Sequence, residues 1–305
     1  MENMAIRRVR SFNRTVTQRI GALYDEYLAR ERPIGASRVL WEIGEAGADV
    51  RTLRVGLDLD SGYLSRLLRT LEQQGLVVVE PGSPDKRVRT VRLTPAGLAE
   101  RRELDRLSDE LARSLLDSLS DTQQARLVEA MGEVERLLTA GLVEVATEDP
   151  SSAAARFCLQ SYAAELDTRF DAGFDPDRSI PAGAAELTEP AGLLLLARLR
   201  GEPIGCGALK FHGSAPAEIK RMWVSPAARG LGVGRRILRE LELRARRRGV
   251  GALRLETNRA LREAVNLYRS AGFEEVAPFN DEPYAHHWFE KRLEKRLETR
   301  LRDAD

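Results

Sequence analysis

Apolar residues in the first 75 positions recur every three or four residues, which is the spacing of helices that bury one face. This spacing predicts four helices, at residues 5–30, 36–46, 50–57 and 63–74. Four leucines of the fourth helix share its inward face. The outward face of that helix is polar and basic, with Tyr63, Ser65, Arg66 and Arg69.

A basic hairpin and two long helices are predicted next. Residues 76–80 and 88–93 are strand-like, and a polar segment with two prolines and a glycine joins them. Thr94 and Pro95 are typical of a helix start, and a further helix is expected from residue 120 to residue 138. The tip and second arm of the hairpin carry the basic residues Lys86, Arg87, Arg89 and Arg92.

After residue 140 the pattern changes to short apolar strands that alternate with helices. We expect helices at residues 153–170, 237–248 and 260–270. We expect strands at residues 142–146, 192–199, 204–211, 219–224, 253–256, 273–276 and 285–290. Residues 171–189 are polar and rich in glycine and proline, so we expect a long loop there, and residues 291–305 predict a charged, helical tail.

The length and the change of pattern predict two domains, residues 1–140 and 141–305, in a multidomain α+β chain. The net charge is +1, so bulk charge argues neither for nor against nucleic acid as a partner. Two cysteines and three histidines offer neither a disulfide framework nor a metal-ligand cluster, so no metal is expected. The longest apolar run, Leu193–Ala197, is too short to span a membrane, and the N-terminus lacks a signal-type apolar core. We therefore expect a cytoplasmic protein without a membrane partner.

The segment from Ile219 to Arg248 has the order strand, glycine-rich turn, helix. Its glycines, at 230, 232 and 234, allow the backbone a close turn before the helix. Several backbone N–H groups then converge at a helix N-terminus, where the helix dipole also favours an anion. Arg229 and Arg235 add positive charge, so the segment predicts a pyrophosphate site. No Lys-Ser or Lys-Thr follows the glycines, so a nucleotide P-loop does not fit.

The pattern Arg-Gly-x-Gly-x-Gly, after a strand ending in Trp-Val-Ser-Pro, resembles the coenzyme A loop of the GNAT acetyltransferase superfamily. The predicted β-α-β-β-β-α-β-α-β-β order of residues 141–292 also resembles the GNAT fold, a mixed α/β fold. The resemblance implies direct acetyl transfer from acetyl-coenzyme A (acetyl-CoA), a co-substrate, to the amine of a small molecule in a ternary complex. The coenzyme-binding residues that it implies are Met222, Trp223, Val224, Arg229, Gly230, Leu231, Gly232, Val233, Gly234, Arg235, Asn258 and Tyr268.

The resemblance also implies roles in the chemistry. The backbone of Trp223 and Val224 lies where the family strand pairs with pantetheine and polarises the thioester carbonyl, and Asn258 ends a strand beside the pantetheine arm. Tyr268 matches the tyrosine that protonates the leaving thiolate, a role that suits a phenol near sulfur. Glu218 stands at the start of the central strand, where several family members place the general base. A chain of water molecules is the alternative base.

Residues 279–288 are dense in polar and aromatic side chains and lie where the family builds acceptor pockets. Their acidic residues could hold an ammonium group, and either histidine could relay a proton because histidine titrates near neutrality. Two basic residues of the central strand could bind a carboxylate of the acceptor, as in an amino acid. The predicted acceptor-binding residues are Lys220, Arg221, Asn280, Asp281, Glu282, Tyr284, His286 and His287.

The run SGYLSRLLRTLEQQGLV, followed by PDKRVRTVRLTPAG, resembles the MarR family of bacterial transcription regulators over roughly residues 10–140. The resemblance implies a winged helix-turn-helix that binds duplex DNA as a homodimer, with the helix at residues 61–74 in the major groove and the wing in a minor groove. The Asp-x-Arg wing signature of the family reads Asp85-Lys86-Arg87 here, where the acid orients the arginine. The predicted DNA-binding residues are Ser61, Tyr63, Ser65, Arg66, Arg69, Lys86, Arg87 and Arg89.

The leading hypothesis is a bifunctional chain, a DNA-binding regulator joined to an N-acetyltransferase. One alternative is a regulator whose GNAT-like domain senses acetyl-CoA without catalysis. The presence of Tyr268 and the dense segment 279–288 favour catalysis. The other alternative is an enzyme whose winged helix serves only in dimerisation, and the basic wing counts against it.

Overall fold

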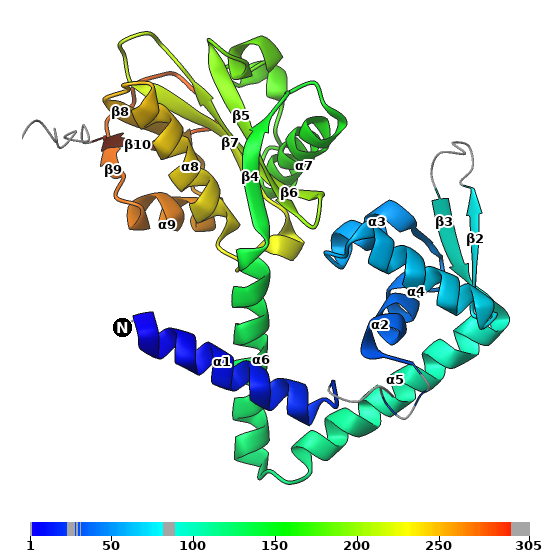
Figure 1. Cartoon of the computed structure of the whole chain (residues 1–305). Helices are drawn as coiled ribbons and strands as arrows, with labels where there is room; N and C mark the ends of the chain where they lie inside the picture. The colour runs from blue at the N-terminus through cyan, green and yellow to red at the C-terminus, as the bar shows by residue number, and fades with distance from the viewer. Residues whose placement is uncertain (1, 23–27, 29, 31, 82–88, 294–305) are drawn as a thin grey trace, which may run out of the picture. The chain divides into compact units, whose positions relative to one another are not determined.

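The computed structural model describes residues 2–22, 28, 30, 32–81 and 89–293, and Figure 1 draws the whole chain. The chain divides into two compact units, Met1–Met131 and Gly132–Asp305. Helix α6, Asp121–Gly141, runs through this division. The proposed domain boundary at residue 140 lies at the end of the same helix.

The first unit is mostly helical, with one small antiparallel sheet of order β1-β3-β2. Its strands are β1 (Ala48–Asp49), β2 (Val77–Pro81) and β3 (Arg89–Leu93). The helices that precede α6 are α1 (Glu2–Arg19), α2 (Ile34–Ile43), α3 (Val50–Gly56), α4 (Ser61–Gln73) and α5 (Pro95–Leu116). The four leucines of α4 are buried in one core with α2 and the sheet, as their spacing predicted.

Two sequence predictions in this unit differ from the structure. The first predicted helix, residues 5–30, is too long, because α1 ends at Arg19 and Gly21 follows with a φ of 72°. That left-handed backbone is one that glycine adopts readily and that commonly ends helices. Strand β1 was not predicted, since two residues are too few to show an alternating pattern.

Side-chain caps fix the start of α4 and of α5, and the cap of α5 is the one predicted. Asp60 Oδ1 accepts a hydrogen bond of 3.0 Å from the backbone N–H of Tyr63. Thr94 Oγ1 accepts one of 3.0 Å from the N–H of Gly97 and donates one of 2.7 Å to the carbonyl of Gly75. The Thr94 hydroxyl therefore joins the end of α4 to the start of α5, which holds the hairpin between them in place.

The second unit is a seven-stranded sheet with helices on both faces (Figure 1), in the order β4-β5-β6-β7-β8-β10-β9. Its strands are β4 (Val143–Glu148), β5 (Gly192–Leu199), β6 (Glu202–Lys210), β7 (Ala217–Val224), β8 (Ala252–Thr257), β9 (Glu274–Val276) and β10 (His287–Arg292). Its helices are α7 (Ala153–Arg169), α8 (Val233–Arg247) and α9 (Arg262–Ser270). The order of elements along the chain is the one predicted from the sequence.

Strand β5 shows why its sequence is apolar at successive positions. Leu193 and Leu195 pack into the core that contains α8 and α9, whereas Leu194 and Leu196 pack into the core that contains α7. Successive strand residues point to opposite faces, so a strand covered on both faces is apolar throughout. The predicted loop 171–189 crosses this unit with two short 3₁₀ turns, η2 (Pro176–Arg178) and η3 (Ala184–Leu187).

Strand β7 separates from its neighbour β8 soon after it begins. The two strands are parallel, and their paired positions are Ala217 with Leu253 and Glu218 with Arg254. On its other side, β7 pairs with β6 along its length, with an irregularity between Cys206 and Ala208. Beyond Glu218, β7 therefore no longer pairs with β8, and space opens between these two strands.

Candidate active site

Two hollows lie along the open part of β7. The larger has a volume of about 440 Å³ and is lined by the end of β7, the glycine-rich turn and α9. The smaller has a volume of about 80 Å³ and is lined by the middle of β7, by β8 and by the loops around residues 170–180 and 282–285. The residues common to both are Tyr162, Leu166, Met222, Leu261, Ala264 and Tyr268. The two hollows therefore meet at Tyr162 and Tyr268.

The glycine-rich turn has the geometry of an anion site. Gly230 and Gly232 have φ angles of 84° and 72°, in the left-handed region. Gly232 is the N-cap of α8 and, having no side chain, leaves the first N–H groups of the helix without a side-chain cap. A Cβ on Gly234 would lie 3.3 Å from Leu267 Cδ2, so glycine keeps the turn close to α9. These features fit a pyrophosphate, because backbone donors and the helix dipole point to one place.

The predicted coenzyme residues fall largely around the larger hollow. Met222, Trp223 and Val224 line it at the end of β7, and the turn contributes all its predicted members except Leu231. Arg235 Nη2 donates to Ser270 Oγ at 2.9 Å, and Arg229 pairs with Glu165 on α7. Asn258 instead lines the smaller hollow, where its amide donates to the carbonyl of Tyr284 at 2.7 Å.

Tyr268 lies on α9 with 4% of its surface exposed, at the junction of the hollows. Burial, with smaller contributions from nearby Tyr162 and Glu256, raises the pKa of the Tyr268 phenol well above its usual value. Burial likewise raises the pKa of Tyr162 to about 12. Both phenols thus keep their protons at neutral pH and can act as donors.

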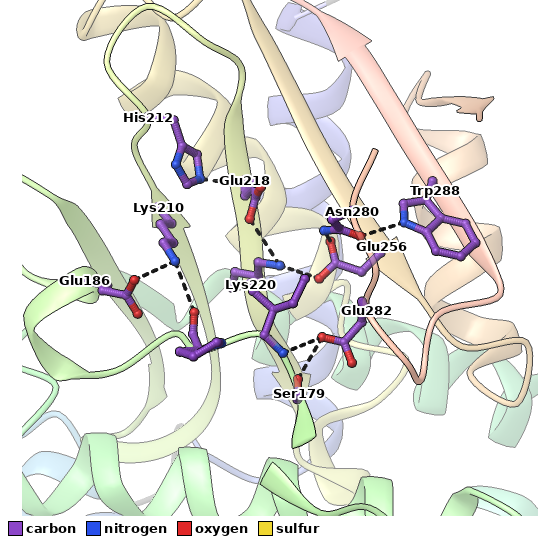
Figure 2. A network of polar contacts seen from close by, with 12 residues as sticks. Ser179, Glu186, Lys210, His212, Glu218, Lys220, Glu256, Asn280, Glu282 and Trp288 are labelled. Carbon is purple, nitrogen blue, oxygen red and sulfur yellow. Dashed lines mark hydrogen bonds and ion pairs between the residues drawn. The ribbon is translucent and has the colours of Figure 1, made fainter. Parts of the chain in front are cut away.

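A chain of charged groups crosses β7 and β8 beside the smaller hollow, as Figure 2 shows. The buried Lys220 ammonium forms an ion pair with Glu256 Oε1 and lies 3.2 Å from Glu218 Oε2. Glu218 Oε1 in turn lies 3.5 Å from His212 Nε2. Glu256 lines the smaller hollow, whereas Glu218, the predicted base, lines neither the smaller nor the larger hollow.

Glu256 is a site residue that the sequence analysis missed. It lies on β8 two positions before Asn258, which directly follows the strand, so the alternation of strand side chains would direct both to the same side. That alternation was a usable signal, although a carboxylate in a strand is usually solvated. Its position in the hollow depends on how β8 lies relative to β7, which the sequence does not show.

Glu282 anchors the loop that covers the smaller hollow. One of its carboxylate oxygens accepts hydrogen bonds from Ser179 Oγ at 2.9 Å and from the N–H of Ile180 at 2.8 Å (Figure 2). The Tyr284 hydroxyl accepts a further bond of 3.0 Å from the N–H of Asp175. The carboxylate of Glu282 thus positions the loop, and its role as an ammonium ligand stays a prediction.

Aromatic rings form one wall of the smaller hollow. Tyr284 stacks on Phe170, with ring centroids 5.7 Å apart, and lies 5.0 Å from Phe174. Arg221 lines the same hollow with its guanidinium 5.8 Å from the ring of Tyr162, and its φ of 56° is unusual for a residue with a side chain. The hollow thus combines an apolar wall with a few charged groups, which is typical of small-molecule sites.

Other predicted acceptor residues do not line this hollow. Asn280 accepts a hydrogen bond from Trp288 Nε1 at 2.8 Å, and its amide lies 3.4 Å from Glu256. His287 pairs with Glu275 at 2.6 Å, which together with Arg269 lowers the pKa of the Glu275 carboxyl. Asp281 and His286 are exposed and likewise lie outside the lining of the hollow.

The predicted DNA-binding residues that the structure describes are all exposed on the first unit. They are exposed along the outward face of α4, and Arg89 is exposed at the start of β3. The Arg66 guanidinium lies 5.8 Å from the ring of Tyr63. Lys86 and Arg87, the other two predicted DNA-binding residues, lie outside the described residues. The predicted DNA-binding residues on α4 are Ser61, Tyr63, Ser65, Arg66 and Arg69.

The described part of the chain contains neither a candidate metal site nor a candidate membrane-spanning helix. Within residues 2–22, 28, 30, 32–81 and 89–293, no group of three or more His, Cys, Asp or Glu side chains is placed to hold a metal ion. Over the same ranges, no helix combines the length and the apolar character that crossing a membrane requires.

Comparison with known proteins gives matches in both units. The acetyltransferase (GNAT) family profile matches residues 153–273, and the MarR family profile matches residues 32–88. An IAA acetyltransferase of Azospirillum brasilense is 41% identical over 99 residues, which are 32% of this chain and 63% of that protein. The N-alpha-acetyltransferase RimI of Mycobacterium tuberculosis is 37% identical over 118 residues, which are 37% of this chain and 71% of that protein.

Solved structures also resemble each unit, at TM-scores below 0.5. An acyl-CoA N-acyltransferase of Klebsiella pneumoniae has 26% identity and a TM-score of 0.40, over 50% of this chain and 98% of that one. MarR of E. coli, in its reduced form, has 27% identity and a TM-score of 0.38, over 41% of this chain and 93% of that one. The chain spans less than two thirds of the first curated relatives, 63% of the Azospirillum protein and 59% of a Schizosaccharomyces pombe N-acetyltransferase.

We predict that Glu282→Ala loosens the loop over the smaller hollow. Three hydrogen-bond donors lose their carboxylate acceptor, and hydrogen bonds to a charged group are worth about 1.5–3 kcal/mol each. Amide hydrogen exchange of residues 175–180, followed by mass spectrometry, should become roughly tenfold faster or more. Asp281→Ala, at the exposed neighbouring residue, is the control and should leave this exchange unchanged. Equal exchange in both variants would show that Glu282 does not anchor the loop.

Proposed function

The chain belongs to the GNAT acetyltransferase family and also carries a MarR-family region, and from this premise we propose that it is a DNA-binding regulator joined to an N-acetyltransferase. The fold agrees with the sequence expectation for both parts, a helical unit with a small hairpin sheet and a mixed α/β unit. The observation that carries the enzymatic half is the meeting of two hollows at Tyr268. One suits a coenzyme and the other suits a small acceptor.

The residues of the larger hollow fit acetyl-CoA. The anion geometry of the turn, with Arg229 and Arg235 beside it, suits the pyrophosphate. The edge of β7 from Met222 to Val224 has left the ladder with β8, so its backbone groups can pair with the amides of pantetheine. Acetyl-CoA supplies the thioester, and Trp223 and Val224 orient it. Asn258 stays a predicted coenzyme contact through its place directly after β8.

Proton transfers at the junction complete the proposed reaction. The acceptor ammonium loses a proton, its nitrogen bonds to the acetyl carbon, and the carbon–sulfur bond breaks. Tyr268, which is buried and protonated, gives its proton to the sulfur, and the second proton that the nitrogen loses on becoming an amide restores the Tyr268 phenol. Glu256 is the nearest candidate to take the ammonium proton, because it lines the acceptor hollow. Glu218 is separated from that hollow by Lys220 and would act only through it or through water.

The acceptor that fits the smaller hollow is a small amine that also carries a carboxylate. Lys220 is already paired with two carboxylates, whereas the Arg221 guanidinium lies over an aromatic ring and faces the hollow. A carboxylate of the acceptor would pair with Arg221, and its side chain would lie against Phe170, Phe174 and Tyr284. An amino acid has this arrangement of groups.

The DNA-binding half rests on the exposed face of α4. Polar and basic side chains on one exposed helix face can reach both base edges and phosphates in a major groove. A homodimer is part of this proposal, because α1 exposes the apolar residues Met4, Ile6, Val9 and Phe12. A cytoplasmic location follows from DNA and acetyl-CoA as partners.

The second candidate function is a regulator that senses acetyl-CoA without catalysis. It would use the same larger hollow and the same DNA-binding face. The acceptor hollow counts against it, since an aromatic wall and the buried Lys220–Glu256 pair beside Tyr268 are not needed for sensing alone.

We predict that Tyr268→Phe lowers turnover by roughly 10²–10⁴ while leaving acetyl-CoA affinity nearly unchanged. Phenylalanine keeps the ring in its buried position and removes only the proton donor. An effect confined to turnover identifies an interaction made in the transition state. The measurement is steady-state kinetics with a panel of amino acids, with coenzyme affinity determined on the same preparations. Parental turnover in the variant would remove Tyr268 from the mechanism.

We predict that the double variant Arg66→Ala, Arg69→Ala loses affinity for duplex DNA by about 1–3 kcal/mol for each arginine that contacts a base, and shows a weaker dependence on salt. Arg106→Ala, Arg113→Ala, on exposed positions of α5, removes the same charge elsewhere and serves as the control. Fluorescence anisotropy with random-sequence duplexes at several salt concentrations makes the comparison. If both double variants bind DNA equally, the role of α4 is wrong.

A further inference from the structure

Glu165 is a carboxylate that lies in the wall of the larger hollow, among the groups that would bind the coenzyme. It is on α7, and its side chain is 18% exposed. Arg229 Nη2 lies 2.5 Å from Glu165 Oε1 and 2.6 Å from Glu165 Oε2. The Trp223 indole N–H donates to Oε2 at 3.0 Å, and Arg169 Nη1 lies 3.2 Å from Oε1. Neither the composition nor the glycine-rich turn indicated this residue.

The position of Glu165 conflicts with the anion that the turn is built to bind. Arg229 immediately precedes Gly230 and is the first basic group of the proposed pyrophosphate site. In the structure its guanidinium is neutralised by a carboxylate from another element. A phosphate beside the same guanidinium would be repelled by that carboxylate, and the repulsion is substantial for partly buried charges.

We propose that Glu165 is an internal counter-anion of Arg229 that competes with the coenzyme phosphates and so sets the affinity for acetyl-CoA. The proposal rests on the proposed coenzyme site. When a phosphate pairs with Arg229, Glu165 gives up that partner, and its charge opposes the incoming anion. Glu165 therefore acts on the phosphate end of the coenzyme and leaves the acetyl-pantetheine end unaffected.

Two features of the contacts allow this exchange without leaving a buried charge unpaired. Glu165 keeps donors from Trp223 and Arg169 when Arg229 turns to the phosphate. The Arg229 side chain is 42% exposed, so it can change partners at small cost. The alternative role for Glu165 is to hold Arg229 in place for the phosphate. In that case, removing the charge of Glu165 would weaken acetyl-CoA binding.

The test is Glu165→Gln, which keeps the shape and a hydrogen-bond acceptor for Trp223 but removes the charge. We expect acetyl-CoA to bind roughly threefold to tenfold more tightly. This range corresponds to a free energy between that of an exposed ion pair and that of a hydrogen bond to a charged group. S-acetylpantetheine, which lacks the phosphates, should bind with parental affinity. Both affinities are measured by calorimetric titration of the full chain, and a thermal unfolding midpoint near that of the parent shows that the variant is folded.

Glu263→Gln is the matched control. Glu263 lines the same hollow and pairs with Arg169 at 2.8 Å instead of with Arg229. Removing its charge therefore measures how acetyl-CoA affinity responds in general to one negative charge fewer in the hollow. A clearly smaller gain in this variant than in Glu165→Gln supports a specific competition for Arg229. Equal gains in both variants, or unchanged or weaker acetyl-CoA binding by Glu165→Gln, would overturn the role of Glu165. A parent chain that does not bind acetyl-CoA would overturn the proposed function as well, so the two failures can be told apart.

Discussion

The early separation of β7 from β8 is the constraint on which the site depends. The two parallel strands pair at Ala217 and Glu218, and beyond these residues the facing edge of β7 leaves the ladder. Unpaired backbone groups in a protein interior need partners, so an opened edge is both a cost to the fold and a place where a ligand can bind. Both hollows follow this opening, and α9 closes it with Tyr268. The coenzyme and acceptor would thus meet where the sheet is interrupted.

The charged side chains of the site are arranged in pairs that lower the cost of burying them. Lys220 is 8% exposed and is paired with two carboxylates, and the Glu165 side chain, 18% exposed, is paired with Arg229. A buried charge without a partner would be expensive, so these pairs allow ionised groups to remain in a partly apolar site. The pairing also leaves few charges for an acceptor to use, which is why Arg221 is the best candidate to bind a carboxylate. Glu282 and Tyr284 instead form hydrogen bonds with Ser179 and Asp175, in the loop over the site.

The sequence predicted most of the fold because each element carries its own local signal. Amphipathic spacing and caps located α2 to α9. The helix predicted over residues 5–30 was too long because α1 ends just before Gly21, whereas the apolar pattern continues beyond it. The glycine-rich turn was found for the same reason, since its spacing and its arginines are adjacent in the chain. Glu165 and Glu256 were missed, and the loop contacts of Glu282 were not predicted, because their partners lie 58 to 103 residues away or across a strand register, and no local pattern encodes such contacts.

Calorimetric titration of the chain with acetyl-CoA, alongside Gly232→Glu and Gly249→Glu, tests the central claim most directly. Gly232 and Gly249 have φ angles of 72° and 74°, at opposite ends of α8, so both substitutions impose the same backbone strain. Only the first places a carboxylate at the N-terminus of α8, in the proposed pyrophosphate site. We predict that the parent chain and Gly249→Glu bind acetyl-CoA and that Gly232→Glu does not. Equal binding by Gly232→Glu and the parent, or no binding by the parent, would contradict the account.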